Sequence, residues 1–142
     1  MRFVTGGADL DQAVDRFIAL HRLSSGAKDA FMTDEMQAFF HAIAQAAAGA
    51  GWLQLSFLQI AGRPVASYFC FDYGNEILVY NSGYDPQAHS QLSPGWVLLA
   101  HVIRHAITLG RGRLDFLQGR EDYKHRFGGV DRPVYRTMIR KK

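Results

Sequence analysis

The sequence contains a single cysteine, Cys70, and no apolar run long enough to cross a bilayer. One cysteine excludes a framework of internal disulfides and fits a reducing compartment. A membrane-spanning helix needs about 20 consecutive apolar residues. Residues 1–7 also lack the apolar core of a secretory signal. We therefore expect a cytoplasmic protein with no membrane span.

The length of 142 residues predicts one domain, residues 1–142. A chain of this size buries roughly 70% of its unfolded surface on folding, so it needs no covalent staples. The formal net charge is only +3, but residues 126–142 hold six Lys or Arg against Asp131 alone. This basic stretch is suited to an anionic ligand such as phosphate or nucleic acid. The alternative is a solvated final strand with a frayed end.

The first third of the chain predicts two helices. The first begins after Asp9, which forms a capping box with Gln12, and its apolar residues recur at helical spacing until residues 24–26. Thr33 caps the second helix, whose acidic first turn suits the helix dipole. That helix ends at Gly49.

After the second helix the apolar pattern changes from helical spacing to alternation. Strands are predicted over residues 52–60, 64–73 and 76–82. The segments "AGRP" and "GN" between them are tight-turn signals. Three consecutive strands joined by tight turns predict an antiparallel meander.

The last third predicts a helix over residues 94–109, a strand over 113–117, a short helix over 120–127 and a final strand over 133–141. A strand, a crossover helix and a strand imply a parallel pair with a right-handed connection. The expected fold is therefore α/β (α+β). It has a mixed, mostly antiparallel sheet flanked by helices, with the parallel pair in its middle.

One candidate site is the start of the helix after the meander, at Ser93, Pro94, Gly95 and Trp96. The first turn of a helix offers unpaired N–H groups and the positive end of a dipole, which receive phosphate readily. Gly95 would let a ligand approach the backbone closely, and this turn has no acidic side chain. The alternative is an ordinary cap, because Ser-Pro is common at helix starts.

Tyr123 is a candidate catalytic residue. A phenol of pKa about 10 is a poor base at neutral pH but can donate a proton to a leaving thiolate or alkoxide. The neighbouring Lys124 and Arg126 could hold a developing negative charge. The alternative is a half-buried helix tyrosine beside solvated cations.

Asp115 alternates with Leu114 and Phe116 in a strand that reads as buried. A carboxylate there must be paired or hydrogen-bonded. It could act as a base or an orienting partner, or belong to a structural ion pair. His101 and His105 have the i, i+4 spacing of zinc ligands, but no third ligand lies near them, so we predict no metal site.

The order of these elements resembles that of the GNAT acyltransferase superfamily. The closer resemblance is to its cellulose-biosynthesis-associated acetyltransferases, which are related to the Fem-type peptidoglycan aminoacyl transferases. Residues 115–124 carry the motif D-F-x-x-G-x-E-x-Y-K. The similar segments are residues 20–44, 51–75, 83–110 and 114–129.

This resemblance implies an acyl-CoA-dependent N- or O-acyltransferase that uses acetyl-CoA and transfers the acyl group directly in a ternary complex. The acceptor would be a small molecule or a cell-envelope precursor. Tyr123 would protonate the departing thiolate, Lys124 would supply charge, and Asp115 or a water would help deprotonate the acceptor. The implied cofactor-binding residues are Leu78, Val79 and Tyr80 for the pantetheine arm, and Ser93, Pro94, Gly95 and Trp96 for the pyrophosphate.

Two other functions remain open for this sequence. The family's Q/R-x-x-G-x-G/A loop reads Q-L-S-P-G-W at residues 91–96, which favours a non-catalytic binding or assembly module. A Fem-type aminoacyl transferase would instead use the basic stretch to hold tRNA. Members of this branch usually carry a similar half upstream, so the chain could be the second half of a two-domain architecture or one partner of a homodimer.

Overall fold

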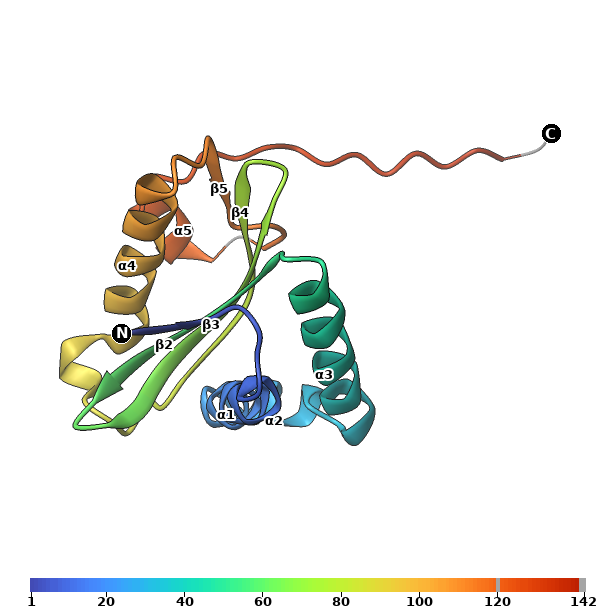
Figure 1. Cartoon of the computed structure of the whole chain (residues 1–142). Coiled ribbons are helices and arrows are strands. Elements are labelled where there is room, and N and C mark those ends of the chain that lie inside the picture. Colours follow the sequence, from blue (N-terminus) through green and yellow to red (C-terminus); the bar gives the residue numbers. More distant parts are fainter. Residues whose placement is uncertain (120, 141–142) are drawn as a thin grey trace.

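The computed structural model describes residues 1–119 and 121–140 and shows a sheet with helices on both faces (Figure 1). The strands lie in the order β1-β2-β3-β4-β5. Helices α1, α2 and α3 cover one face, while α4 and α5 lie on the other. The elements are β1 (Arg2–Val4), α1 (Leu10–Leu23), α2 (Gly26–Phe31), α3 (Asp34–Gly49), β2 (Leu53–Ile60), β3 (Arg63–Tyr73), β4 (Glu76–Tyr84), a 3-10 turn (Ser90–Leu92), α4 (Pro94–Thr108), β5 (Arg113–Asp115) and α5 (Asp122–Arg126).

The predicted meander is confirmed: β2, β3 and β4 pair antiparallel in sequence order. Both turns have left-handed backbone at their two central residues. The values of φ are 49° and 79° at Ala61-Gly62, and 60° and 64° at Gly74-Asn75. Two-residue turns of this kind match the twist of the flanking strands.

The alternating strands divide the core between the two faces of the sheet. Aromatic and aliphatic side chains dominate both layers, and burial of such groups is the main driving force for folding. Leu53, Leu55, Phe57 and Phe69 pack with α1 and α3. The layer against α4 contains Ala66, Tyr68, Cys70, Ile77 and Val79. Within the described residues, no helix is both long and apolar enough to span a membrane.

The helix starts follow the sequence signals only in part. Thr33 caps α3 as predicted, because its hydroxyl oxygen accepts the Met36 N–H at 3.3 Å. The capping box at Asp9 is wrong, since that side chain makes no cap and instead forms an ion pair with Arg2 at 2.9 Å. Helix α2 was not predicted, and Ser25 caps it by accepting the Lys28 N–H at 3.2 Å.

The parallel pair is present, but its position differs from the expectation. β5 pairs with β4 and is the last strand of the order, so the pair lies at an edge of the sheet. The final strand expected over residues 133–141 does not form in the described residues up to 140. Val134, Tyr135 and Ile139 are each more than 80% exposed there, and the segment runs away from the body of the molecule (Figure 1). Lys141 lies outside the described residues.

Gly83 is the point at which α1 comes closest to the sheet. A Cβ atom added at Gly83 would lie 2.7 Å from the His21 Cα and closer still to the backbone N of His21. These are backbone atoms inside a packed helix, so they cannot move aside as a flexible side chain could. The missing side chain therefore sets the distance between α1 and β4.

We predict that Gly83→Ala lowers the free energy of unfolding by about 1–3 kcal/mol, because overpacking forces the backbones of α1 and β4 apart. Urea denaturation measures the change. Gly49→Ala is the matched control, since an added Cβ meets nothing within 4 Å at the end of α3. Equal stability of the two variants would contradict the close approach.

Candidate active site

The site is built where β4 and β5 separate. The two strands pair at only three positions, from Glu76↔Arg113 to Leu78↔Asp115. Beyond these positions β4 continues to Tyr84, whereas β5 ends. The pair therefore has a closed end, where Glu76 faces Arg113, and an open end, which begins after Leu78 and Asp115.

Ion pairs fix the closed end. The Glu76 carboxylate lies 2.8 Å from the Arg113 guanidinium on the neighbouring strand. Asp72 on β3 likewise pairs with Arg111, just before β5, at 2.7 Å. Their side chains are only partly exposed, so solvent screens these pairs less than fully exposed ones.

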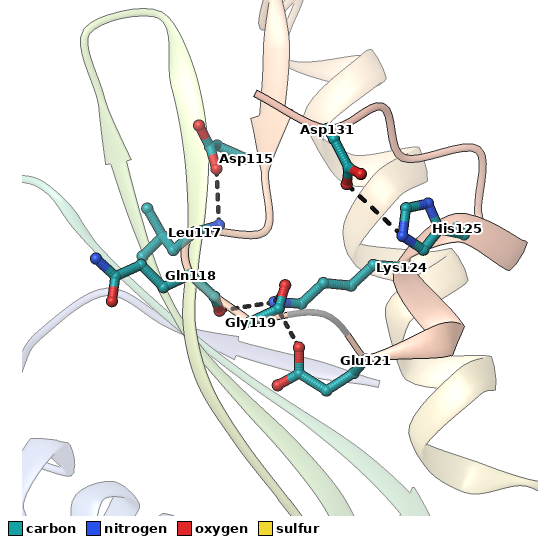
Figure 2. Close-up of polar contacts among 8 residues, drawn as sticks. All are labelled: Asp115, Leu117, Gln118, Gly119, Glu121, Lys124, His125 and Asp131. Atoms are coloured by element: carbon teal, nitrogen blue, oxygen red, sulfur yellow. Dashed lines mark hydrogen bonds and ion pairs between the residues drawn. The ribbon is translucent and has the colours of Figure 1, made fainter. Parts of the chain in front are cut away.

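Asp115 shapes the open end. Its carboxylate accepts the Leu117 N–H at 2.7 Å, a turn that Asp commonly stabilises (Figure 2). The backbone at Leu117 is left-handed, with φ of 54°, so the chain leaves the line of the strand there. Asp115 does not line the pocket described next.

A pocket of about 120 Å³ occupies the opening between the two strands. It brings together four of the predicted residues, Val79, Tyr80, Tyr123 and Lys124. The full lining is Lys28, Val79, Tyr80, Asn81, Ser82, Phe116, Gln118, Glu121, Tyr123 and Lys124. Leu78, by contrast, belongs to the paired part of β4.

Strand β4 contains a bulge at Tyr80. Val79 pairs with Cys70 and Asn81 with Phe69, so Tyr80 faces no residue of β3. The extra residue of a bulge lacks ladder partners, which leaves its peptide groups free for a ligand. The Tyr80 ring packs instead near Phe40, Phe69 and Phe71.

Tyr123 reaches the pocket from α5 and is half-buried. Its ring meets Phe116 edge-on at 6.0 Å between centroids. Burial raises the pKa of its phenol to about 12, and the charge of Glu121 acts in the same direction. The phenol therefore stays protonated at neutral pH and can serve as a proton donor.

Lys124 is buried and its ammonium group is fully used within the chain. It donates to the carbonyl oxygens of Gln118 at 2.8 Å and Gly119 at 3.3 Å, and it lies 2.9 Å from the Glu121 carboxylate (Figure 2). An ammonium has three protons to donate, and each has a partner here. Lys124 thus holds the segment that follows β5, and Glu121 balances its charge.

The start of α4 offers fewer free amides than the sequence suggested. Pro94 has no N–H, and the N–H groups of Trp96 and Val97 both donate to the Ser93 carbonyl, at 2.9 and 3.1 Å. Within the described part of the chain, Gly95 alone keeps an unbonded amide in the 93–96 segment.

The α4 start lies outside the pocket lining but touches α5. The Trp96 ring lies 5.5 Å from the Phe127 ring, and the Arg126 guanidinium stands 5.6 Å from the Trp96 ring centroid. A guanidinium and the positive end of a helix dipole are thus found together. Both favour an anion.

A family model described as "Acetyltransferase (GNAT) domain" matches residues 1–125. The chain belongs to this GNAT acetyltransferase family. No curated protein matches the chain significantly.

Solved structures share the GNAT fold with this chain at low sequence identity. A structure described as a probable acetyltransferase has a TM-score of 0.66 and 11% identity, with 100% of both chains covered. The aminoglycoside N-acetyltransferase AAC(6')-Iy in complex with CoA has a TM-score of 0.60 and 13% identity, covering 99% of this chain and 93% of its own. A ribosomal-protein-alanine N-acetyltransferase from Brucella melitensis biovar Abortus 2308 has a TM-score of 0.60 and 11% identity, covering 99% and 97%.

Several pocket residues of this GNAT domain were not predicted from the sequence: Lys28, Asn81, Ser82, Gln118 and Glu121. Lys28 comes from α2, and its Nζ donates to the Ser82 carbonyl at 2.6 Å. Because α2 itself was not foreseen, nothing in the sequence placed Lys28 beside β4. The motif at residues 115–124 did contain Glu121, and its pairing with Lys124 at i, i+3 was the available signal.

We expect Lys124→Met to lower the free energy of unfolding by about 1–3 kcal/mol, because it leaves two carbonyl groups and one carboxylate without their donor. Amide hydrogen exchange should rise most in residues 116–119. Arg104→Met, which removes an exposed cation from α4, should change neither measurement. Unchanged exchange in Lys124→Met would show that its bonds do not hold the segment.

Proposed function

We propose that the chain, as a single domain over residues 1–142, transfers an acyl group from acyl-CoA to an amine or hydroxyl of an acceptor. Acetyl-CoA is the proposed donor, and the acceptor is a small molecule or a cell-envelope precursor. The observation that carries the proposal is the separation of β4 and β5, which opens a pocket with Tyr123 on its wall. Membership of the GNAT family supports it.

The proposed donor site follows the unpaired part of β4. The amides of a pantetheine arm can pair with strand backbone that has no neighbour, as in strand addition. Val79 and the bulged Tyr80 supply such backbone on the side of β4 that faces away from β3, whereas Leu78 faces Asp115 in the ladder. The pyrophosphate would lie at the α4 start, bound by the Gly95 N–H and the Arg126 guanidinium.

In the proposed reaction the acceptor attacks the thioester carbonyl directly in a ternary complex. The bond from carbon to nitrogen or oxygen forms, the carbon–sulfur bond breaks, and the thiolate takes the phenolic proton of Tyr123. The raised pKa of Tyr123 keeps that proton available at neutral pH. Because Asp115 does not line the pocket, we assign removal of the acceptor proton to a water.

We place the chain in the cellulose-biosynthesis-associated branch, related to Fem-type proteins, on the motif at residues 115–124. This placement implies that the chain works with a second, similar half or as a homodimer. From the sequence composition we also propose a cytoplasmic location. The runner-up function is a non-catalytic binding module, which is favoured by the α4 start, where most amides are already bonded. A Fem-type transferase that holds tRNA would use the exposed basic residues between 126 and 140.

Isothermal titration should show binding of both acetyl-CoA and desulfo-CoA. Tyr123→Phe should keep that affinity but slow the release of free CoA thiol, measured with a panel of primary amines and amino sugars, by roughly a hundredfold or more. Failure of both nucleotides to bind at millimolar concentration would remove the cofactor assignment. Equal thiol release by the variant would return Tyr123 to a structural role.

Arg126→Met should weaken acetyl-CoA binding and make it less sensitive to salt, because one charge contact to the pyrophosphate is lost. Titrations at low and high ionic strength measure this. Arg104→Met serves as the control, since it removes an exposed cation away from the α4 start. Identical affinities for the two variants would place the pyrophosphate elsewhere.

A further inference from the structure

Lys28 lines the same pocket as Tyr123, although it comes from the opposite end of the chain. Its ammonium group donates to the Ser82 carbonyl on β4 at 2.6 Å. The side chain therefore lies across the sheet edge, inside the space where a donor's acyl group would lie next to Tyr123. It is not a solvated surface lysine.

The backbone around Lys28 is fixed as well. The Ser25 hydroxyl caps α2 by accepting the Lys28 N–H. The preceding residue, Ser24, connects α1 to the end of β4. Its hydroxyl donates to the Leu20 carbonyl of α1 and accepts the Tyr84 N–H of β4 at 2.9 Å. The start of α2 is thus held against the end of β4, and the lysine reaches the pocket from a defined position.

The burial of Lys28 favours its neutral form. Burial lowers the pKa of its ammonium group, and the Glu121 carboxylate opposes this only in part. His21 on α1 adds no cation at neutral pH, because burial lowers its pKa to about 4. The remaining charged groups face each other, with Lys124 paired to Glu121 and Asp29 paired to Arg22. A neutral lysine amine is a nucleophile.

We propose that Lys28 is an acyl-acceptor site within the chain, modified by acetyl-CoA bound where β4 and β5 separate. This inference rests on the proposed function, because it needs a bound thioester. The chain has four lysines. Of the two within the described residues, Lys124 already uses its three donors, whereas the Lys28 ammonium group donates to the Ser82 carbonyl.

The step balances as an ordinary acyl transfer. The neutral Nζ attacks the thioester carbonyl carbon, the nitrogen–carbon bond forms, and the carbon–sulfur bond breaks. The CoA thiolate takes the Tyr123 proton, the amide nitrogen releases a proton to water, and the phenol is reprotonated from solvent. The products are acetyl-Lys28 and CoA thiol, and no net proton is released, because the proton lost by the nitrogen balances the one that re-forms the phenol.

The modification limits itself. An acetylated Lys28 has lost its charge and its nucleophilic nitrogen. The added acetyl group also occupies part of a pocket of only about 120 Å³. The transfer therefore happens once per chain and leaves less room for an external acceptor.

The test incubates the purified chain with acetyl-CoA and maps acetylated peptides by mass spectrometry over time. We expect one acetyl group per chain, at Lys28, appearing at least tenfold faster than in a heat-unfolded sample of the same chain. The rate should rise with pH and level off at a lower pH than in the unfolded sample. Tyr123→Phe should slow it at least tenfold with acetyl-CoA affinity unchanged, and Lys28→Arg should abolish it.

Several results would overturn the inference. If acetyl-CoA binds but Lys28 remains unmodified, the inference is wrong while the proposed function stands. It is also wrong if the modification is no faster than in the unfolded chain or spreads evenly over the four lysines. If titration shows that neither acetyl-CoA nor desulfo-CoA binds, the proposed function and this inference fall together.

Discussion

The separation of β4 from β5 is the constraint on which the site depends. At one end the Glu76–Arg113 ion pair joins β4 to β5, and the Asp72–Arg111 ion pair joins β3 to the residues just before β5. At the other end, the turn at Asp115 directs the chain away after three paired positions. Beyond Leu78 the backbone of β4 pairs only with β3, and its other side has no strand partner. Unpaired backbone groups next to a pocket are costly to bury alone and are well suited to a ligand that carries its own amides.

The parts of the fold that could be predicted are those encoded over short distances in the sequence. Alternating apolar residues and the turns Ala61-Gly62 and Gly74-Asn75 define the meander, and the Thr33 cap marks a helix start. The prediction of a final strand was wrong because a strand also depends on contacts with distant parts of the chain. Residues 133–140 alternate as a strand should, but a strand also needs a neighbour to pair with, and the sequence does not state where one lies. β1 and α2, with three and six residues, are too short to give a periodic signal.

The site residues were also predicted only in part, and again those that short-range sequence patterns indicate were found. Val79, Tyr80, Tyr123 and Lys124 were foreseen and meet at one pocket. Lys28 was not, because it arrives through the packing of α1 and α2 against β4, which no local pattern describes. The role of Lys124 also changed, since the carbonyl groups that it binds are invisible in a sequence. The sequence shows which residue types are available at the site, but it does not show which groups they bind in the folded chain.

Gly83 faces α1 only because the bulge at Tyr80 has shifted the alternation of β4 by one residue. Side chains alternate with a period of two, so losing one residue between these positions would turn a larger side chain toward the helix. A substitution between the bulge and Gly83 leaves this alternation unchanged, whereas an insertion or a deletion changes the side on which every later residue lies. In relatives that keep this architecture, we therefore expect the number of residues between the bulge and the glycine to be fixed more strictly than the identity of the residues that separate them.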